Sequence, residues 1–145
     1  MLMGPITEVS GMLSQLALPG DNPDVAGLVM RHKNDAVSTL NAGYASAGEH
    51  YVMNIYGKKA SALYSLHTGM YFLKQGEKTP QHLQFEKNDT LAEQMEEFGE
   101  CIKTGNEPEV GGEWASRSLA VIRAGVKSAR ERRMVTIDEI LQTGE

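Results

Sequence analysis

The chain has 145 residues, a formal net charge of -5, 41% hydrophobic residues and 23% charged residues. This length fits one folded domain over residues 1–145, and the composition excludes the disordered, collagen-like and disulfide-rich classes. The acidic balance disfavours nucleic-acid binding, and the single cysteine, Cys101, favours a reducing, cytoplasmic compartment. No apolar run approaches the ~18 residues of a membrane span, so we expect no membrane segment.

The first half of the chain has the pattern of an antiparallel sheet. Residues 6–18 alternate small and apolar side chains, with a bend or bulge expected near Gly11. After a loop rich in Pro and Gly, residues 24–65 hold four short runs of strand-forming residues separated by turn clusters. These turns leave no room for crossover helices, so we expect one continuous meander, with further strands over residues 69–74 and 82–86.

One strand of this meander is apolar on both faces. Leu28 and Met30 lie on one face, and Val25 and Val29 lie on the other. An antiparallel sheet in water usually has one polar face. A second face that is half apolar predicts a covering partner, and we expect a homo-oligomer that forms through this open face of the sheet.

Beyond the sheet, the hydrophobic period changes from two to 3.6. Thr90 and Glu93 have the spacing of a capping box, which predicts the start of a helix that ends at Gly105. A second helix is predicted over residues 113–132, and residues 134–137 are expected to form a short edge strand before a ragged tail. The first helix has an apolar face of Leu91, Met95, Phe98 and Ile102, and the second has a predicted buried stripe of Ala115, Leu119, Ile122, Val126 and Ala129.

These elements predict an α+β fold: a predominantly antiparallel open β-sheet of six or more strands, with two C-terminal helices packed on one face. Three segments in this order are EHYVMNIYGKKASALYS, LAEQMEEFGECIKTGNEPEV and SLAVIRAGVKSARERRMVTI. The order resembles the C-terminal domain of the Gfo/Idh/MocA family of NAD(P)-dependent sugar and inositol oxidoreductases. The first segment looks like the family's strand-Gly-strand element, the second like its helix followed by C-I-x-T-G-x-x-P-x-V, and the third like its closing helix and edge strand.

The resemblance implies the substrate-side and oligomerisation domain of a sugar or polyol oxidoreductase. Family members begin with a Rossmann domain that has a Gly-rich phosphate loop and a Lys-Pro dipeptide, and neither motif occurs in this sequence. We therefore expect no activity from this chain alone, and NAD or NADP only in a full-length enzyme, of which the chain would be an excised or truncated part. The alternative is a free-standing, non-catalytic subunit for oligomerisation or small-ligand binding, which pairs with a separate Rossmann chain.

Tyr44 and His67 are the candidate substrate-binding residues, because hydroxyl and imidazole groups both exchange hydrogen bonds with sugar hydroxyls. An exposed histidine and a half-buried tyrosine are the structural alternative. The four histidines lack the spacing of a metal site, so we assign no metal ligand and no catalytic or cofactor-binding residue. A third hypothesis is a small unrelated α+β enzyme that uses Tyr44 and a histidine. The basic residues Lys127, Arg130, Arg132 and Arg133 are interpreted as cations at a helix end, with a nucleic-acid or acidic-partner site as the alternative.

Overall fold

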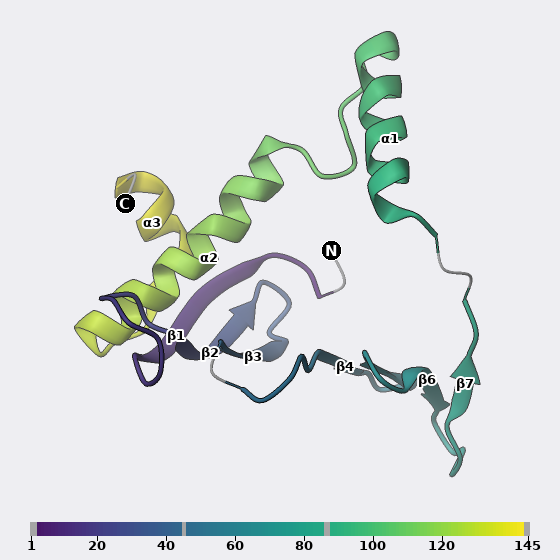
Figure 1. Ribbon diagram of the computed structural model, residues 1–145, viewed down its shortest axis with the longest axis horizontal. Coiled ribbons are helices and arrows are strands. Elements are labelled where there is room, and N and C mark those ends of the chain that lie inside the picture. The colour runs from purple at the N-terminus through teal and green to yellow at the C-terminus, as the bar shows by residue number, and fades with distance from the viewer. Residues whose placement is uncertain (1–2, 45, 86–87, 144–145) are drawn as a thin grey trace. The chain divides into compact units, whose positions relative to one another are not determined.

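The computed structural model describes residues 3–44, 46–85 and 88–143 (Figure 1). The chain forms two compact units. The first consists of Met1–Ser46 and Gly105–Glu145, and the second of Ala47–Thr104. The second unit is therefore inserted, in sequence, between the two parts of the first. The single-domain organisation expected over residues 1–145 stays a prediction.

The first unit contains a four-stranded antiparallel sheet in the order β3-β2-β1-β8 (Figure 1). Val9 in β1 is paired with Met30 on one side and with Val135 on the other, so distant parts of the sequence meet at this strand. The pairing of β1 with β2 is irregular between Ile6 and Glu8, and the bulge expected near Gly11 is wrong. The strands are β1 (Ile6–Ser14), β2 (Val25–His32), β3 (Val37–Gly43) and β8 (Val135–Thr136).

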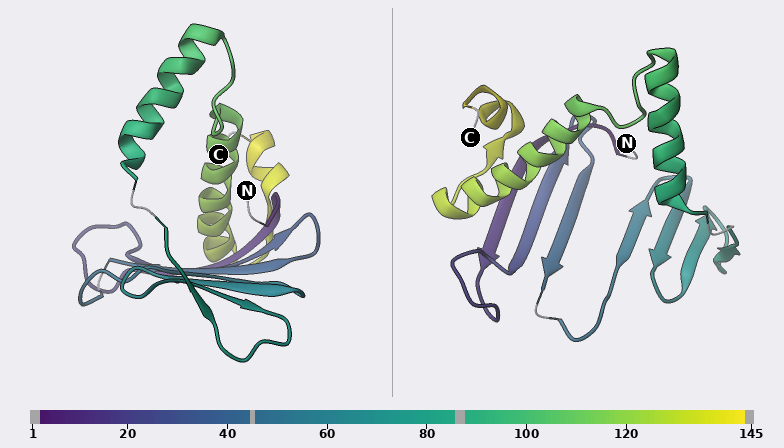
Figure 2. Two further views of the ribbon diagram at one scale, coloured as in Figure 1. Left: turned by 90° about the vertical axis from the view of Figure 1, so that its right-hand side faces the viewer. Right: turned by 45° about the horizontal axis from the view of Figure 1, so that its top comes forward.

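Two helices cover one face of this sheet, as both views in Figure 2 show. They are α2 (Gly112–Glu131) and α3 (Ile137–Thr143). A Cβ atom added at Gly11 would lie 2.9 Å from the carbonyl oxygen of Gly125 in α2, so the two glycines allow the helix to approach the sheet closely. The fully buried residues of α2 are all small, namely Ala120, Ala124, Gly125 and Ser128, and the partly buried Val121 packs against the same core.

The stripe predicted to be buried on α2 is wrong. Leu119, Ile122 and Val126 are 49%, 60% and 46% exposed, and Ala115 is exposed as well; of the predicted stripe only Ala129 is half-buried. This helix has two apolar sides, and periodicity alone cannot tell which one faces the sheet. The close approach at Gly11 decides the question, because it admits only small side chains.

The core of the first unit lies between the sheet and the two helices. Ser128 is its buried polar member: its hydroxyl accepts a hydrogen bond from the backbone N–H of Gly11 at 3.0 Å and donates to the carbonyl oxygen of Arg133 at 2.5 Å. This one hydroxyl therefore ties the sheet to the C-terminal end of α2. The hydrophobic core consists of Val9, Leu28, Met30, Ala120, Ala124, Val135, Ile137 and Ile140.

The second unit contains another four-stranded antiparallel sheet, whose strands lie in sequence order. Its turns are tight: the N–H of Gly57 donates to the carbonyl oxygen of Ala60 at 2.9 Å, and Gly69 takes a φ of 80°. Of the strand predicted over residues 82–86, only the first part is extended, and Glu86 lies outside the described residues. The strands are β4 (Val52–Tyr56), β5 (Ala60–Ser65), β6 (Gly69–Lys74) and β7 (Gln81–Leu83).

Helix α1 (Thr90–Thr104) also belongs to the second unit. Its N-terminus is capped by Asp89, whose Oδ1 accepts hydrogen bonds from the N–H groups of Leu91 at 3.2 Å and Ala92 at 3.1 Å. The cap predicted at Thr90 is therefore wrong by one residue, because the residue before the first helical turn reaches these N–H groups. No residue of α1 is buried, and the apolar face of Leu91, Met95, Phe98 and Ile102 is exposed.

The predicted α+β fold class is confirmed. We expected one continuous meander. In the described residues, hydrogen-bonded pairing instead gives two sheets of four strands each. β3 ends at Gly43 and β4 begins at Val52, so the two strands are further apart in sequence than the strands of a tight hairpin. The C-terminal segment was expected to be a ragged tail, and this expectation is wrong because the segment forms α3. The hydroxyl oxygen of Thr136 accepts the N–H of Glu139 at 3.2 Å and caps that helix.

Candidate functional site

The first sheet has an exposed face on the side away from α2, which we call the outer sheet face. Ser10, Val29 and Thr39 lie side by side on it, because they are paired across three adjacent strands. Val29 is 51% exposed, and Met12 is 83% exposed. This exposed apolar surface agrees with the half-apolar second face expected from the sequence. The outer sheet face carries Ser10, Met12, Val29, Arg31, Val37 and Thr39.

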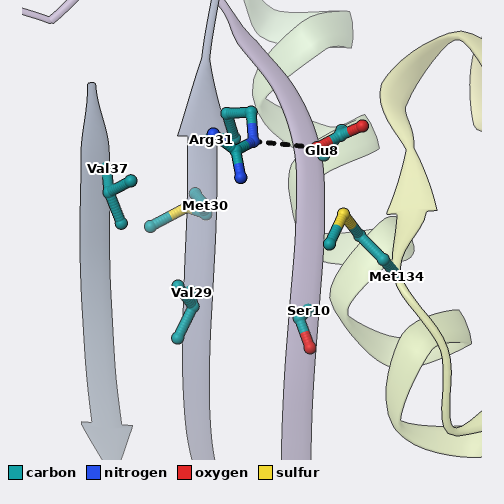
Figure 3. Close-up of a pocket in the computed structure, with 7 residues that line it drawn as sticks. All are labelled: Glu8, Ser10, Val29, Met30, Arg31, Val37 and Met134. Atoms are coloured by element: carbon teal, nitrogen blue, oxygen red, sulfur yellow. Dashed lines mark hydrogen bonds and ion pairs between the residues drawn. The ribbon is translucent and has the colours of Figure 1, made fainter. Parts of the chain in front are cut away.

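Figure 3 shows a shallow hollow on this face, with a volume of about 70 Å³. Beside it, Nε of Arg31 donates to Oε2 of Glu8 at 3.1 Å, so these two charges are paired within the face. Pockets for small ligands usually enclose about 300–1,000 Å³, so the hollow is too small for a sugar. The hollow is lined by Glu8, Ser10, Val29, Met30, Arg31, Val37 and Met134.

The two predicted substrate-binding residues lie in different units. Tyr44 directly follows β3 and is 83% exposed, so it is not the half-buried tyrosine of the structural alternative. His67 lies in the turn between β5 and β6 and is also exposed. Its Nε2 lies 3.0 Å from the carbonyl oxygen of Glu49, and its ring stacks on that of His50 at a centroid distance of 5.9 Å. A joint role of Tyr44 and His67 in substrate binding stays a prediction.

Across residues 3–44, 46–85 and 88–143, no three His, Cys, Asp or Glu side chains converge on a site that could hold a metal ion. Cys101 lies partly buried in α1 as a free thiol.

Asp24 organises the loop between β1 and β2, a role that the sequence analysis missed. Its buried carboxylate accepts hydrogen bonds from the backbone N–H groups of Leu16 at 2.8 Å, and of Ala17 and Leu18 at 2.7 Å each. The hydrogen bond from Leu18, followed by those from Ala17 and Leu16, lowers the pKa of Asp24. The only sequence signal is an aspartate at the point where a loop rich in Pro and Gly re-enters a strand.

The basic residues at the end of α2 form an ion-pair network with α3. Glu139 accepts hydrogen bonds from both terminal nitrogens of Arg133, at 3.0 and 2.5 Å, and its Oε1 lies 3.2 Å from Nζ of Lys127. The hydrogen bond from Arg133, more than that from Lys127, lowers the pKa of Glu139 from its ordinary value of 4.5 to about 2. The same contact raises the pKa of Arg133. These cations therefore fasten α3 to the end of α2, which supports the structural interpretation of the basic cluster.

A family model described as the oxidoreductase family C-terminal alpha/beta domain, of the Gfo/Idh/MocA type, matches residues 1–137. The chain belongs to the Gfo/Idh/MocA oxidoreductase family. Within this family it corresponds to the C-terminal α/β domain, as the sequence resemblance implied. The hypothesis of a small unrelated enzyme is wrong, because the match covers nearly the whole chain.

Solved structures with the same fold include three oxidoreductases. One from Desulfitobacterium hafniense, described as NADPH-dependent, is 28% identical, covers 96% of this chain and 44% of its own, and has a TM-score of 0.88. The Caulobacter crescentus aldose-aldose oxidoreductase, complexed with glycerol, is 23% identical over 92% of this chain and 42% of its own, with a TM-score of 0.77. The WlbA dehydrogenase of Bordetella pertussis, complexed with NADH and UDP-GlcNAcA, is 21% identical over 93% of this chain and 41% of its own, with a TM-score of 0.78.

The chain thus spans less than half of the length of each of these structures. No curated protein matches the chain. In the described part of the chain, every helix is too short or too polar to cross a membrane. The cytoplasmic location stays a prediction.

Proposed function

We propose that this chain is the substrate-side and oligomerisation part of an NAD(P)-dependent oxidoreductase that acts on a sugar or polyol. The observation that carries this proposal is the family match over residues 1–137, in a chain that covers only 44% of the D. hafniense relative. Two relatives with the same fold support a carbohydrate substrate. One is named an aldose-aldose oxidoreductase, and the other was crystallised with the sugar nucleotide UDP-GlcNAcA.

The described residues of this chain do not fit a dinucleotide. NAD and NADP bind at the carboxyl ends of parallel strands, with the pyrophosphate at the N-terminus of a helix that follows a strand directly. Every strand pair in the two sheets is antiparallel, and a turn-rich segment precedes α2. The cofactor would therefore be held by another part of a longer protein, or by a separate chain.

Tyr44 and His67 are the side chains that we assign to the substrate. A carbonyl oxygen can only accept, so the contact between Nε2 of His67 and the carbonyl oxygen of Glu49 favours the tautomer with hydrogen on Nε2. In that tautomer Nδ1 can accept a hydrogen bond from a sugar hydroxyl. The exposed phenol of Tyr44 can both donate and accept.

The outer sheet face is the surface that we assign to self-association. It combines exposed apolar side chains with charges that are already paired, as in the contact of Arg31 with Glu8. A symmetric contact through this face would bury apolar area without burying a charged side chain that lacks a partner. An interface of about 800 Å² per subunit would be ordinary for such a contact.

The test is a chimera in which this chain replaces the matched part of the D. hafniense oxidoreductase, assayed with NADPH, NADP and a panel of aldoses and polyols. We expect dinucleotide-dependent turnover by the chimera and none by the 145-residue chain alone. Tyr44→Phe and His67→Ala should each raise KM for the sugar, whereas Tyr56→Phe, at another exposed tyrosine, should not. Turnover by the chain alone, or a folded chimera that binds NADPH and reduces nothing in the panel, would contradict the proposal.

An immunoblot of extract from the native source distinguishes a free-standing subunit from a part of a longer oxidoreductase. A band well above 15.9 kDa means that the chain is part of a longer oxidoreductase. A band at 15.9 kDa means that the cofactor-binding half, if there is one, is a separate chain.

A further inference from the structure

His32, the last residue of β2, is a buried histidine with a side-chain exposure of only 5%. Its backbone forms the turn between β2 and β3. The N–H of His32 donates to the carbonyl oxygen of Ala36 at 2.9 Å, and its carbonyl oxygen accepts the N–H of Asp35 at 3.0 Å. Because the backbone alone makes these contacts, the turn does not depend on the imidazole ring.

The imidazole of His32 instead joins the segment before β1 to β3. Its Nδ1 lies 2.9 Å from the carbonyl oxygen of Gly4, and its Nε2 lies 2.8 Å from the hydroxyl oxygen of Ser38. A carbonyl oxygen can only accept a hydrogen bond, so Nδ1 carries the hydrogen. In that tautomer Nε2 accepts the hydrogen of the Ser38 hydroxyl. The two hydrogen bonds fix both the orientation of the ring and its tautomer.

The segment before β1 is held beyond the end of its strand. The ladder between β1 and β2 ends at the pair of Ile6 with His32. Beyond this pair, the N–H of Lys33 donates to the carbonyl oxygen of Pro5 at 2.9 Å, next to the contact of His32 with Gly4. Gly4 has a φ of 80°, which favours glycine, and the ring of Pro5 fixes the next φ. The direction in which the chain enters β1 is therefore closely defined.

We infer that His32 is a positioning residue, which fixes the part of the oxidoreductase that precedes β1 relative to the first sheet. This inference rests on the proposed function. The matched family model describes a C-terminal domain, and the chain covers 44% of the D. hafniense relative, so the larger part of such a protein precedes this sheet. A change of chain direction at Gly4 would displace that part, and a misplacement of about 1 Å can cost about a hundredfold in rate.

The test compares two substitutions of His32 that each keep one of its two contacts. In His32→Asn the amide nitrogen takes about the place of Nδ1 and can donate to Gly4, whereas in His32→Gln the longer amide reaches Ser38 and the contact with Gly4 is lost. In the D. hafniense chimera described above, His32→Gln should lower kcat by about tenfold or more without changing KM for the sugar. His32→Asn should keep kcat within about twofold of the parent chimera.

Ser38→Ala is the matched control, because it removes the partner of Nε2 and leaves the contact with Gly4 in place. It should also keep kcat within about twofold of the parent. Equal kcat values for His32→Gln and His32→Asn, or a lower value for His32→Asn, would overturn the inference, because both variants remove the ring and share any loss of its packing.

Proteolysis of the chimera gives a second readout that does not require turnover. His32→Gln should raise the rate of cleavage before residue 6 by about tenfold, while cleavage within residues 15–23, the loop that Asp24 holds, stays unchanged. His32→Asn should change neither rate. An equal rise at both places would indicate a general loss of stability and would overturn the positioning role.

If the chimera does not fold, the 145-residue chain itself tests the contact. Long-range ¹H–¹⁵N NMR should find the hydrogen of His32 on Nδ1, and His32→Gln should speed hydrogen exchange at the N–H of Lys33 by about tenfold but not at that of Gly11, which donates to Ser128. Hydrogen on Nε2 in place of Nδ1, or equal exchange of Lys33 in the parent and His32→Gln, would overturn the inference.

The two proposals fail in different ways. A chimera that turns over sugar at the same rate with His32→Gln and His32→Asn would overturn the positioning role alone. A chimera that binds no dinucleotide, but shows faster cleavage before residue 6 only in His32→Gln, would overturn the proposed function and keep the role of His32.

Discussion

Gly11 in β1 and Gly125 in α2 lie so close that a Cβ atom added at Gly11 would sit 2.9 Å from the carbonyl oxygen of Gly125. The same Cβ atom would also meet Cδ2 of Leu28 at 2.8 Å. The backbone N–H of Gly11 donates to the hydroxyl of Ser128 one helical turn further along. Helix and sheet therefore approach closely enough for backbone contact, and the side chain of Leu28 packs against Gly125 beside it.

Gly11→Ala should destabilise the chain by ~1–3 kcal/mol, because the added methyl group meets helix backbone that cannot move aside without separating helix and sheet. Urea unfolding measures the change. The control is Gly99→Ala in α1, where an added Cβ meets nothing within 4 Å and should stabilise by ~0.5–1 kcal/mol. A Gly11→Ala variant as stable as the parent chain would show that the contact can relax.

Acidification should weaken the attachment of α3 to α2. The folded-state pKa of Glu139 is lowered to about 2, so its ion pairs stabilise the fold above its ordinary pKa of 4.5 and are lost as pH falls from about 4.5 to about 2. Thermal unfolding of Glu139→Gln should therefore show a lower Tm at pH 7 and a shallower decline of Tm across this range. Glu113→Gln, which removes a highly exposed partner of Arg117, should leave the pH profile unchanged. Parallel profiles for Glu139→Gln and the parent chain would contradict the assignment.

Asp24→Asn should loosen the loop between β1 and β2. The neutral amide loses the charge that three backbone N–H groups now stabilise, and the lowered pKa of Asp24 means that this stabilisation is present at neutral pH and lost on acidification. We expect a lower Tm at pH 7 and faster proteolysis within residues 15–23. Asp21→Asn, in the exposed part of the same loop, should change neither. Equal cleavage rates for the two variants would argue against the role of Asp24.

The outer sheet face should control self-association. Met12→Glu together with Val29→Glu would bury unpaired carboxylates in a contact between copies, and should weaken it by roughly two orders of magnitude. Light scattering coupled to gel filtration measures the mass of the parent chain and the variant. Ile122→Glu is the matched control, since it is an exposed apolar residue on α2. A parent chain that is already monomeric at micromolar concentration would contradict self-association through the outer sheet face.

Much of the fold could be predicted from local pattern. The end of α1 before Gly105, the strand over residues 69–74 and the antiparallel pairing of β2 with β3 and of β4 with β5 follow from periodicity and turn residues, which act over short distances in sequence. The orientation of α2 could not be predicted, because it depends on the contact of Gly125 with Gly11, 114 residues away. The capping role of Asp89 was missed because Thr90 and Glu93 offered an equally plausible spacing.

The candidate site was less predictable than the fold. Exposure of Val29 followed from a strand that is apolar on both faces, so part of the outer sheet face could be expected from sequence. The exposure of Ile122 and Val126 could not be expected, because both residues had been assigned to the buried stripe of the helix. Tyr44 and His67 were selected by side-chain chemistry alone, and they lie in separate units, so their joint role stays a prediction.

The pairing of Val9 with Val135 has a consequence for synthesis. The core of the first unit needs Ile137 and Ile140, which are synthesised after every strand of the second unit. The inserted unit can therefore fold first, while the face of β1 to β3 that α2 and α3 later cover remains exposed to solvent. During that interval the nascent chain would be most dependent on chaperones, and a stop codon shortly before residue 135 should yield an aggregating product rather than a slightly shorter version of the same fold.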